Sequence, residues 1–128
     1  MKHLFLAMLF LLVAGFGCGK DEKDDVKPSG PDEMEYRVSS SSGATVARII
    51  SYENETGGTT SLDDAALPFS VKFKSTKRPR TLALLVILPD QNGQQQSVTG
   101  TILVNGKEVE TDTGAGSSAS ISTAYVLQ

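Results

Sequence analysis

An alternation of apolar and polar residues, repeated between frequent turns, constrains the fold of this chain more than any other feature. It is clearest at residues 67–74, LPFSVKFK, where every second side chain is apolar. A period of two is typical of a β-strand with one buried side and one solvent-facing side. After Met34 no stretch combines a 3.6-residue period with helix caps. The sequence therefore predicts an all-β domain.

Turn signals divide this domain into short strands. Asn105-Gly106 is the dipeptide favoured in type I′ hairpins, because both residues tolerate a positive φ. Pro68 cannot donate a backbone hydrogen bond, so we expect it at a strand start or a sheet edge. Residues 81–88, TLALLVIL, are expected to form the most buried strand, whereas Leu62–Ala66 fits either a strand edge or a helical turn. About seven short strands with regular turns predict an antiparallel, immunoglobulin-like β-sandwich.

The N-terminus has the segment order of an exported protein. A basic start precedes the apolar run Leu4–Val13, and small residues then lead to Cys18, the only cysteine. This order is typical of a secretory signal peptide. With a cysteine at the cleavage point it resembles a bacterial lipoprotein signal, although Gly15 and Phe16 depart from the residues usual before that cysteine. The resemblance implies that residues 1–17 are removed and that Cys18 carries the lipid.

Two other interpretations of the N-terminus remain. Residues 4–16 would reach roughly 20 Å as a helix, which is short of the roughly 30 Å hydrocarbon core and makes a poor permanent span. A plain signal peptide would leave a free thiol in an exported protein, a liability that lipidation removes. We therefore predict that the membrane is a partner through the lipid anchor and that the anchor lies in the outer membrane.

A charged, disordered tether is predicted for residues 18–33. Within it Lys20, Asp21 and Glu22 resemble the export signal of surface-displayed lipoproteins in some Gram-negative bacteria. The same composition would also make a solvated tether, so surface and periplasmic orientations both stay open. The predicted organisation is a signal peptide at 1–17, the tether at 18–33 and the β-sandwich at 34–128.

The residue inventory argues against catalysis. The single histidine, His3, precedes Cys18, so the mature chain has no Ser-His or Cys-His pair and no zinc site of the usual kind. Asp63 and Asp64 are adjacent and would point to opposite faces of a strand. No cofactor, metal site or catalytic residue is predicted, and a hydrolase built on distant carboxylates is the weakest hypothesis. A net charge of −3 also argues against a nucleic-acid partner.

Two sets of residues are candidates for binding. A basic group without an acidic residue inside it consists of Lys72, Lys74, Lys77, Arg78 and Arg80. It is either a contact for an anion, an acidic headgroup or a partner, or a solvated strand face that guards a sheet edge. The tyrosines are candidates for stacking on a glycan, but each lies in a register that also suits core packing: Tyr36, Tyr52 and Tyr125.

Five segments in chain order carry a resemblance to one family. They are Tyr36–Ser39, Ala47–Tyr52, Leu67–Ser70, Ile102–Val109 and Ala124–Val126. Together they resemble the extracytoplasmic domain of the MmpS-type transport accessory proteins (mycobacterial membrane protein small), with Phe69 in place of the tryptophan of the family's Leu-Pro-Trp-Ser signature. That family is held by a transmembrane helix. Its cysteine pair, which would fall near Gly100 and Ala124, is absent here.

The resemblance implies a β-sandwich accessory subunit beside a proton-driven exporter of lipids or siderophores. We therefore predict a non-catalytic, lipid-anchored envelope protein whose partner is an envelope transporter or another envelope protein. The alternative is a surface-exposed module that binds a glycan or a host ligand, which the export signal and the tether favour. The fold carries over more safely than the role, because one fold hosts many functions.

Overall fold

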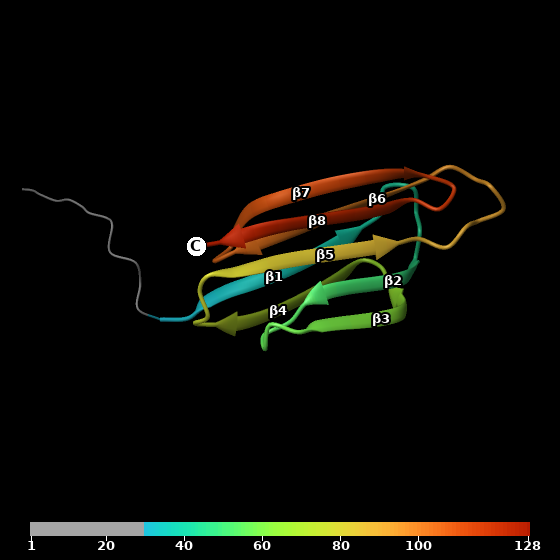
Figure 1. The fold of residues 1–128 in the computed structure, drawn as a ribbon. Helices are drawn as coiled ribbons and strands as arrows, with labels where there is room; N and C mark the ends of the chain where they lie inside the picture. The colour runs from blue at the N-terminus through green and yellow to red at the C-terminus, as the bar shows by residue number, and fades with distance from the viewer. Residues whose placement is uncertain (1–29) are drawn as a thin grey trace, which may run out of the picture.

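The alternating sequence folds into a β-sandwich of two four-stranded antiparallel sheets (Figure 1). The computed structural model describes residues 30–128. The strands in chain order are β1 (Asp32–Ser39), β2 (Val46–Glu53), β3 (Thr59–Ala66), β4 (Phe69–Ser75), β5 (Arg80–Ile87), β6 (Gln96–Val104), β7 (Lys107–Gly116) and β8 (Ser120–Leu127). One sheet has the order β4-β1-β6-β7 and the other β3-β2-β5-β8. The predicted antiparallel sandwich is confirmed.

The core lies between the two sheets and consists of the inward residues of the alternating pattern. Met34, Tyr36 and Val38 of β1 are at most 1% exposed, and inward residues of β2, β5 and β8 meet them from the other sheet. The Tyr36 ring lies 5.2 Å from that of Tyr52 and 6.0 Å from that of Phe73, measured between centroids. Burial of each large apolar side chain contributes roughly 1.5–3 kcal/mol, so this layer is the main source of stability.

β3 contains the segment Leu62–Ala66, for which the sequence allowed either a strand edge or a helical turn. It pairs with β2 along its length except at Asp64, with Leu62 opposite Ile50 and Ser61 opposite Ser51. Aspartate and alanine have low β-propensity, and Asp64 adopts a φ of 52°. Pairing with β2 overrides that local preference, which brings the number of strands to eight.

Two turn predictions are confirmed. Pro68 directly precedes β4, an edge strand, where its missing N–H costs no ladder bond. Asn105 and Gly106 join β6 to β7 with φ values of 52° and 81°, the two positive angles that a type I′ turn requires.

The sequence predicts that the domain starts at Met34. In the structure β1 begins two residues earlier, at Asp32. The Asp32 carboxylate is buried and accepts hydrogen bonds from Arg78 Nε at 2.7 Å and from Asn105 Nδ2 at 3.0 Å. These partners lie 46 and 73 positions away in the sequence, so the local pattern gives no sign of them.

β5 is not the most buried strand, contrary to the prediction for residues 81–88, because its alternate residues are exposed whereas no residue of β6 is. Leu82, Leu84 and Val86 are at most 1% exposed, but Leu85 is 37% exposed and Ala83 also faces solvent. The reason is that only one face of this sheet is covered by the other sheet. The outward side of β5 is apolar and open.

The predicted signal peptide at 1–17, the lipidation site Cys18 and the export signal Lys20, Asp21 and Glu22 lie outside the described residues. Within residues 30–128 there is no helix that is long and apolar enough to cross a membrane.

Candidate interaction surface

Arg80 does not join the other basic residues at the surface. Its side chain is 4% exposed, and its Nη2 lies 2.8 Å from Glu53 Oε1. The same nitrogen donates to the carbonyl oxygen of Asn54 at 2.6 Å, and the guanidinium lies 5.5 Å from the centroid of the Phe73 ring. Arg80 therefore belongs to an interior polar network and is not available to an external anion.

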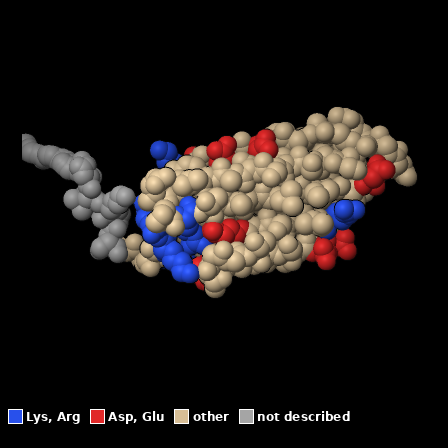
Figure 2. Space-filling view, in the orientation of Figure 1, with Lys and Arg blue, Asp and Glu red and all other residues tan. Residues whose placement is uncertain are grey.

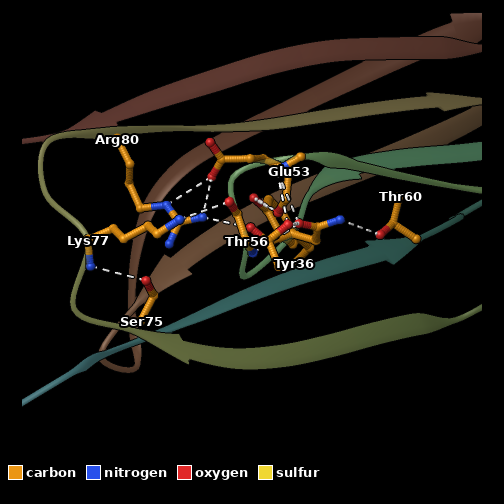
Figure 3. A network of polar contacts seen from close by, with 9 residues as sticks. Tyr36, Glu53, Thr56, Thr60, Ser75, Lys77 and Arg80 are labelled. Carbon is orange, nitrogen blue, oxygen red and sulfur yellow. Dashed lines mark hydrogen bonds and ion pairs between the residues drawn. The ribbon is translucent and has the colours of Figure 1, made fainter.

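The same network fixes the turn between β2 and β3. The Tyr36 hydroxyl donates to the Glu53 carbonyl oxygen at 2.8 Å, and burial raises the pKa of Tyr36 well above its usual value. Asn54 Nδ2 donates to Thr60 Oγ1 at 2.9 Å, and Asn54 Oδ1 accepts from the Thr56 N–H at 3.0 Å. Lys77 Nζ donates to the Thr56 carbonyl oxygen at 3.0 Å (Figure 3). These bonds hold the loop before β5 against the turn.

Arg78 connects the two ends of the sandwich chain. Its Nε and Nη2 donate to the Asp32 carboxylate at 2.7 and 2.9 Å, and its Nη1 donates to the Gln128 carbonyl oxygen. The hydrogen bond to Asp32 raises the pKa of Arg78 above its ordinary value. Arg78 therefore stabilises the start of β1 and the chain's last residue together.

Lys72 and Lys74 point outward from β4, opposite Glu35 and Glu33 of β1. Glu35 also accepts hydrogen bonds from Arg37 Nε at 2.7 Å and from Ser70 Oγ at 2.9 Å. The Arg37 hydrogen bond holds the pKa of Glu35 below its ordinary value, so the carboxylate stays charged beside Lys72. The basic segment contains no acidic residue, but strand pairing supplies acidic neighbours from β1.

The positive charge therefore has compensating negative charge beside it. Figure 2 shows Lys and Arg atoms gathered at the end of the sandwich that carries the start of β1 and the C-terminus, with acidic atoms next to them. Contact with an anion or a partner stays a prediction for the exposed members Lys72, Lys74, Lys77 and Arg78.

The three tyrosines do not form an exposed platform for a sugar. Tyr36 is 0% exposed, and Tyr52 and Tyr125 are half-buried and pack against the core.

Across residues 30–128 no group of three or more His, Cys, Asp or Glu side chains is placed to hold a metal ion.

The outer face of the β3-β2-β5-β8 sheet differs in character from that of the other sheet. The outward residues of β5 and β8 form rows in which Thr81 lies opposite Val126, Ala83 opposite Ala124, and Leu85 opposite Ser122. None of these side chains carries a charge, and Leu85 and Val126 are 37% and 51% exposed. We call this surface the neutral face and define it by Thr81, Ala83, Leu85, Ser122, Ala124 and Val126.

A shallow depression of about 490 Å³ lies over the neutral face, where Ser51 of β2 also lines it. Sequence reasoning missed this surface because the apolar run 81–88 was interpreted as buried. One signal was present: the small residues Thr81 and Ala83 alternate with the larger Leu82 and Leu84.

A comparison with protein families connects this geometry to known sequences. The model of a family described as Mycobacterium membrane protein matches residues 10–125. The chain belongs to this family. The MmpS-type resemblance is thereby confirmed, and the family name places the protein in association with a membrane. A search of curated proteins finds no match.

The two positions near which the family's cysteine pair was expected face different sides of their sheets in this chain. The absent cysteine pair was expected near Gly100 and Ala124, yet Ala124 faces solvent on the neutral face. Gly100 faces the core, where an added Cβ would lie 2.1 Å from Ile121 Cδ1. The β8 residue that faces Gly100 is therefore Ile121, three positions before Ala124.

Proposed function

We propose that this protein is a non-catalytic accessory subunit of an export-type complex in the cell envelope. The observation that carries the proposal is the family match over residues 10–125, which covers β1 to β7, nearly all of β8 and part of the apolar segment Leu4–Val13. Family membership supports membrane association. The accessory role and the export-type complex are what the MmpS-type family implies for this chain.

The neutral face is the partner-contact surface in this proposal. The central parts of protein interfaces are depleted of charged residues, and exposed apolar patches mark protein contacts. Leu85 and Val126 supply exposed apolar area there, whereas the outer face of the other sheet carries the opposed charges of β1 and β4. None of the six side chains of the neutral face is charged, so a partner can cover them without desolvating a charge among them; Glu53, which pairs with Arg80, lines the edge of the depression.

Crosslinking in intact cells, followed by purification on a tag at Gln128, tests this role. We expect a large transporter or another envelope subunit to be recovered in fixed proportion. Leu85→Lys, which places a charge in the neutral face, is expected to lower that recovery about tenfold, because a buried unpaired charge is costly. Thr111→Lys, on the outer face of the other sheet, is the matched control and should leave recovery unchanged. Recovery of this protein alone would refute the proposal.

The proposal places the anchor at Cys18, with Lys20, Asp21 and Glu22 directing the protein to the outer membrane and favouring display at the cell surface. Each buried methylene of an acyl chain contributes about 0.8 kcal/mol, so several chains hold a protein firmly. Cys18 lies outside the sandwich, so its replacement should leave the fold intact.

We expect Cys18→Ala to abolish incorporation of a radiolabelled fatty acid and to release the protein from the membrane fraction. Resistance of the sandwich to protease serves as the control and should match that of the native chain. If the variant retained the fatty-acid label at the native level, the lipid would have to be attached at a site other than the Cys18 thiol, which would contradict the prediction.

A further inference from the structure

The sandwich has four edge strands, and three of them carry residues that hinder pairing with another strand. Charged side chains and proline at an edge are the usual devices against edge-to-edge association. β3 carries Asp63 and Asp64, and β4 carries Lys72 and Lys74 after Pro68. The charged residues of β7 are Lys107, Glu108, Glu110 and Asp112.

β8 is the exception among these edges. Its sequence, SISTAYVL, contains no charged residue, no proline and no glycine, and half of its residues are β-branched or aromatic. All eight residues pair with β5 on one side. Near its start the backbone approaches β7, since a Cβ at Gly114 would lie 1.9 Å from the Ser120 carbonyl oxygen. From Ser122 to Leu127, no strand of the described sandwich forms a ladder on the other side.

We propose that β8 pairs antiparallel with β8 of a second copy of this chain, about a two-fold axis at Ala124. Two copies of one strand place each residue opposite a residue of the same sequence, so charge decides which edge can pair with itself. Self-pairing of β3 would bring carboxylates together, and self-pairing of β4 would bring ammonium groups together. β8 introduces no such repulsion, which is why the second copy is the occupant that fits it.

The two faces of the sheet limit the register to axes that pass through a residue, and Ala124 lies near the middle of the open stretch from Ser122 to Leu127. An axis at Ala124 places Ser122 opposite Val126 and Thr123 opposite Tyr125, so outward residues meet outward ones and inward residues meet inward ones. Val126, which is 51% exposed in one copy, then gains Ser122 of the second copy as a neighbour on the same face. The two sheets become one of eight strands with a continuous neutral face.

An edge contact of this length buries less than the roughly 1,600 Å² of a standard interface, so the pairing should be weak in dilute solution. Confinement of both copies at a membrane raises their effective concentration and favours the dimer. Self-association needs no transporter, so the inference goes beyond the accessory role and can be tested separately from it.

Cysteine scanning of the full chain in membranes tests the axis. The single replacements are Ser120→Cys, Ser122→Cys, Ala124→Cys and Val126→Cys, followed by mild oxidation and non-reducing electrophoresis. A residue on the axis meets its own copy at about 4.5–5.5 Å between Cα atoms, within disulfide range. Val126 would lie roughly 13 Å from its own copy. We therefore expect the disulfide-linked dimer to be strongest at position 124 and to fall off in both directions.

The native chain, with Cys18 alone, and Ala115→Cys on β7 give the background for this scan. Uniform crosslinking along β8, or none above that background, would overturn the proposal. If Ala124→Cys formed a disulfide with a different protein and not with a second copy, the proposal would also be overturned, and the edge of β8 would be assigned to a strand of that partner.

A charge-exchange experiment tests the same contact without oxidation. Ala124→Lys and Ala124→Glu, expressed singly, should each lower co-purification of two differently tagged copies about fivefold, because like charges then lie opposite each other. Co-expression of Ala124→Lys with Ala124→Glu should restore it. Ala115→Lys is the matched control and should have no effect. Failure of the opposite charges to restore co-purification would refute pairing at this axis.

Discussion

Replacing Arg80 with alanine is expected to lower the free energy of unfolding by roughly 3–5 kcal/mol, the range for breaking a buried ion pair. The Arg80 side chain is 4% exposed and that of Glu53 is 16% exposed, so loss of the guanidinium leaves a carboxylate with little access to water. The Asn54 carbonyl oxygen loses one of its two donors and keeps the Gly57 N–H, and the Phe73 ring loses its cationic neighbour. Urea denaturation of the native and variant chains measures the change.

Two controls separate the buried charge from loss of an arginine in general. Arg48→Ala removes an arginine of β2 that is exposed to solvent, so its loss should cost much less than the loss of Arg80. The pair of replacements Arg80→Met and Glu53→Met should be less destabilising than Arg80→Ala, because no buried charge is left unpaired. An Arg80→Ala cost no greater than that of Arg48→Ala would contradict the role assigned to this network.

The fate of Arg80 shows where sequence reasoning about the basic group ended. The alternation predicted that Lys72 and Lys74 face outward, and they do. It gave no sign that Arg80 begins an inward-facing series, because its partner Glu53 lies 27 positions away. In the same way, the acidic residues opposite Lys72 and Lys74 belong to β1, which is distant from β4 in the sequence, so the pattern of β4 alone gives no sign of them. Periodicity assigns a side chain to a face, but only strand pairing assigns its neighbours.

The sandwich itself was predictable because its signals are local. The alternating strands and the Asn105-Gly106 turn need no distant partner for their interpretation, and each has the predicted form. The apolar character of residues 81–88 did not by itself reveal the neutral face, because an apolar strand can lie between two layers or have one open side. Sheet order decides between these cases, and here it leaves Ala83 and Leu85 in solvent.

Gly100→Ala is the second large effect that we expect, with a loss of roughly 1–3 kcal/mol in the free energy of unfolding from overpacking. Gly100 lies opposite Val38 on the inner side of its sheet. An added Cβ would lie 2.1 Å from Ile121 Cδ1 and 2.8 Å from Leu84 Cδ2, both side chains of the opposing sheet. Because both neighbours are buried, they have little room to move.

A double-mutant cycle with Ile121→Val identifies the atom responsible. Ile121→Val removes Cδ1 and alone should cost about 0.5–1.5 kcal/mol. In the Gly100→Ala background the same truncation makes room for the new methyl group, so the double variant should be more stable than the sum of the single effects by about 1 kcal/mol or more. Gly58→Ala is the control, because a Cβ there meets Thr56 Oγ1 at an ordinary 3.5 Å. Strict additivity would mean that Ile121 does not fill the space beside Gly100, and the packing of β6 against β8 would then differ from that described.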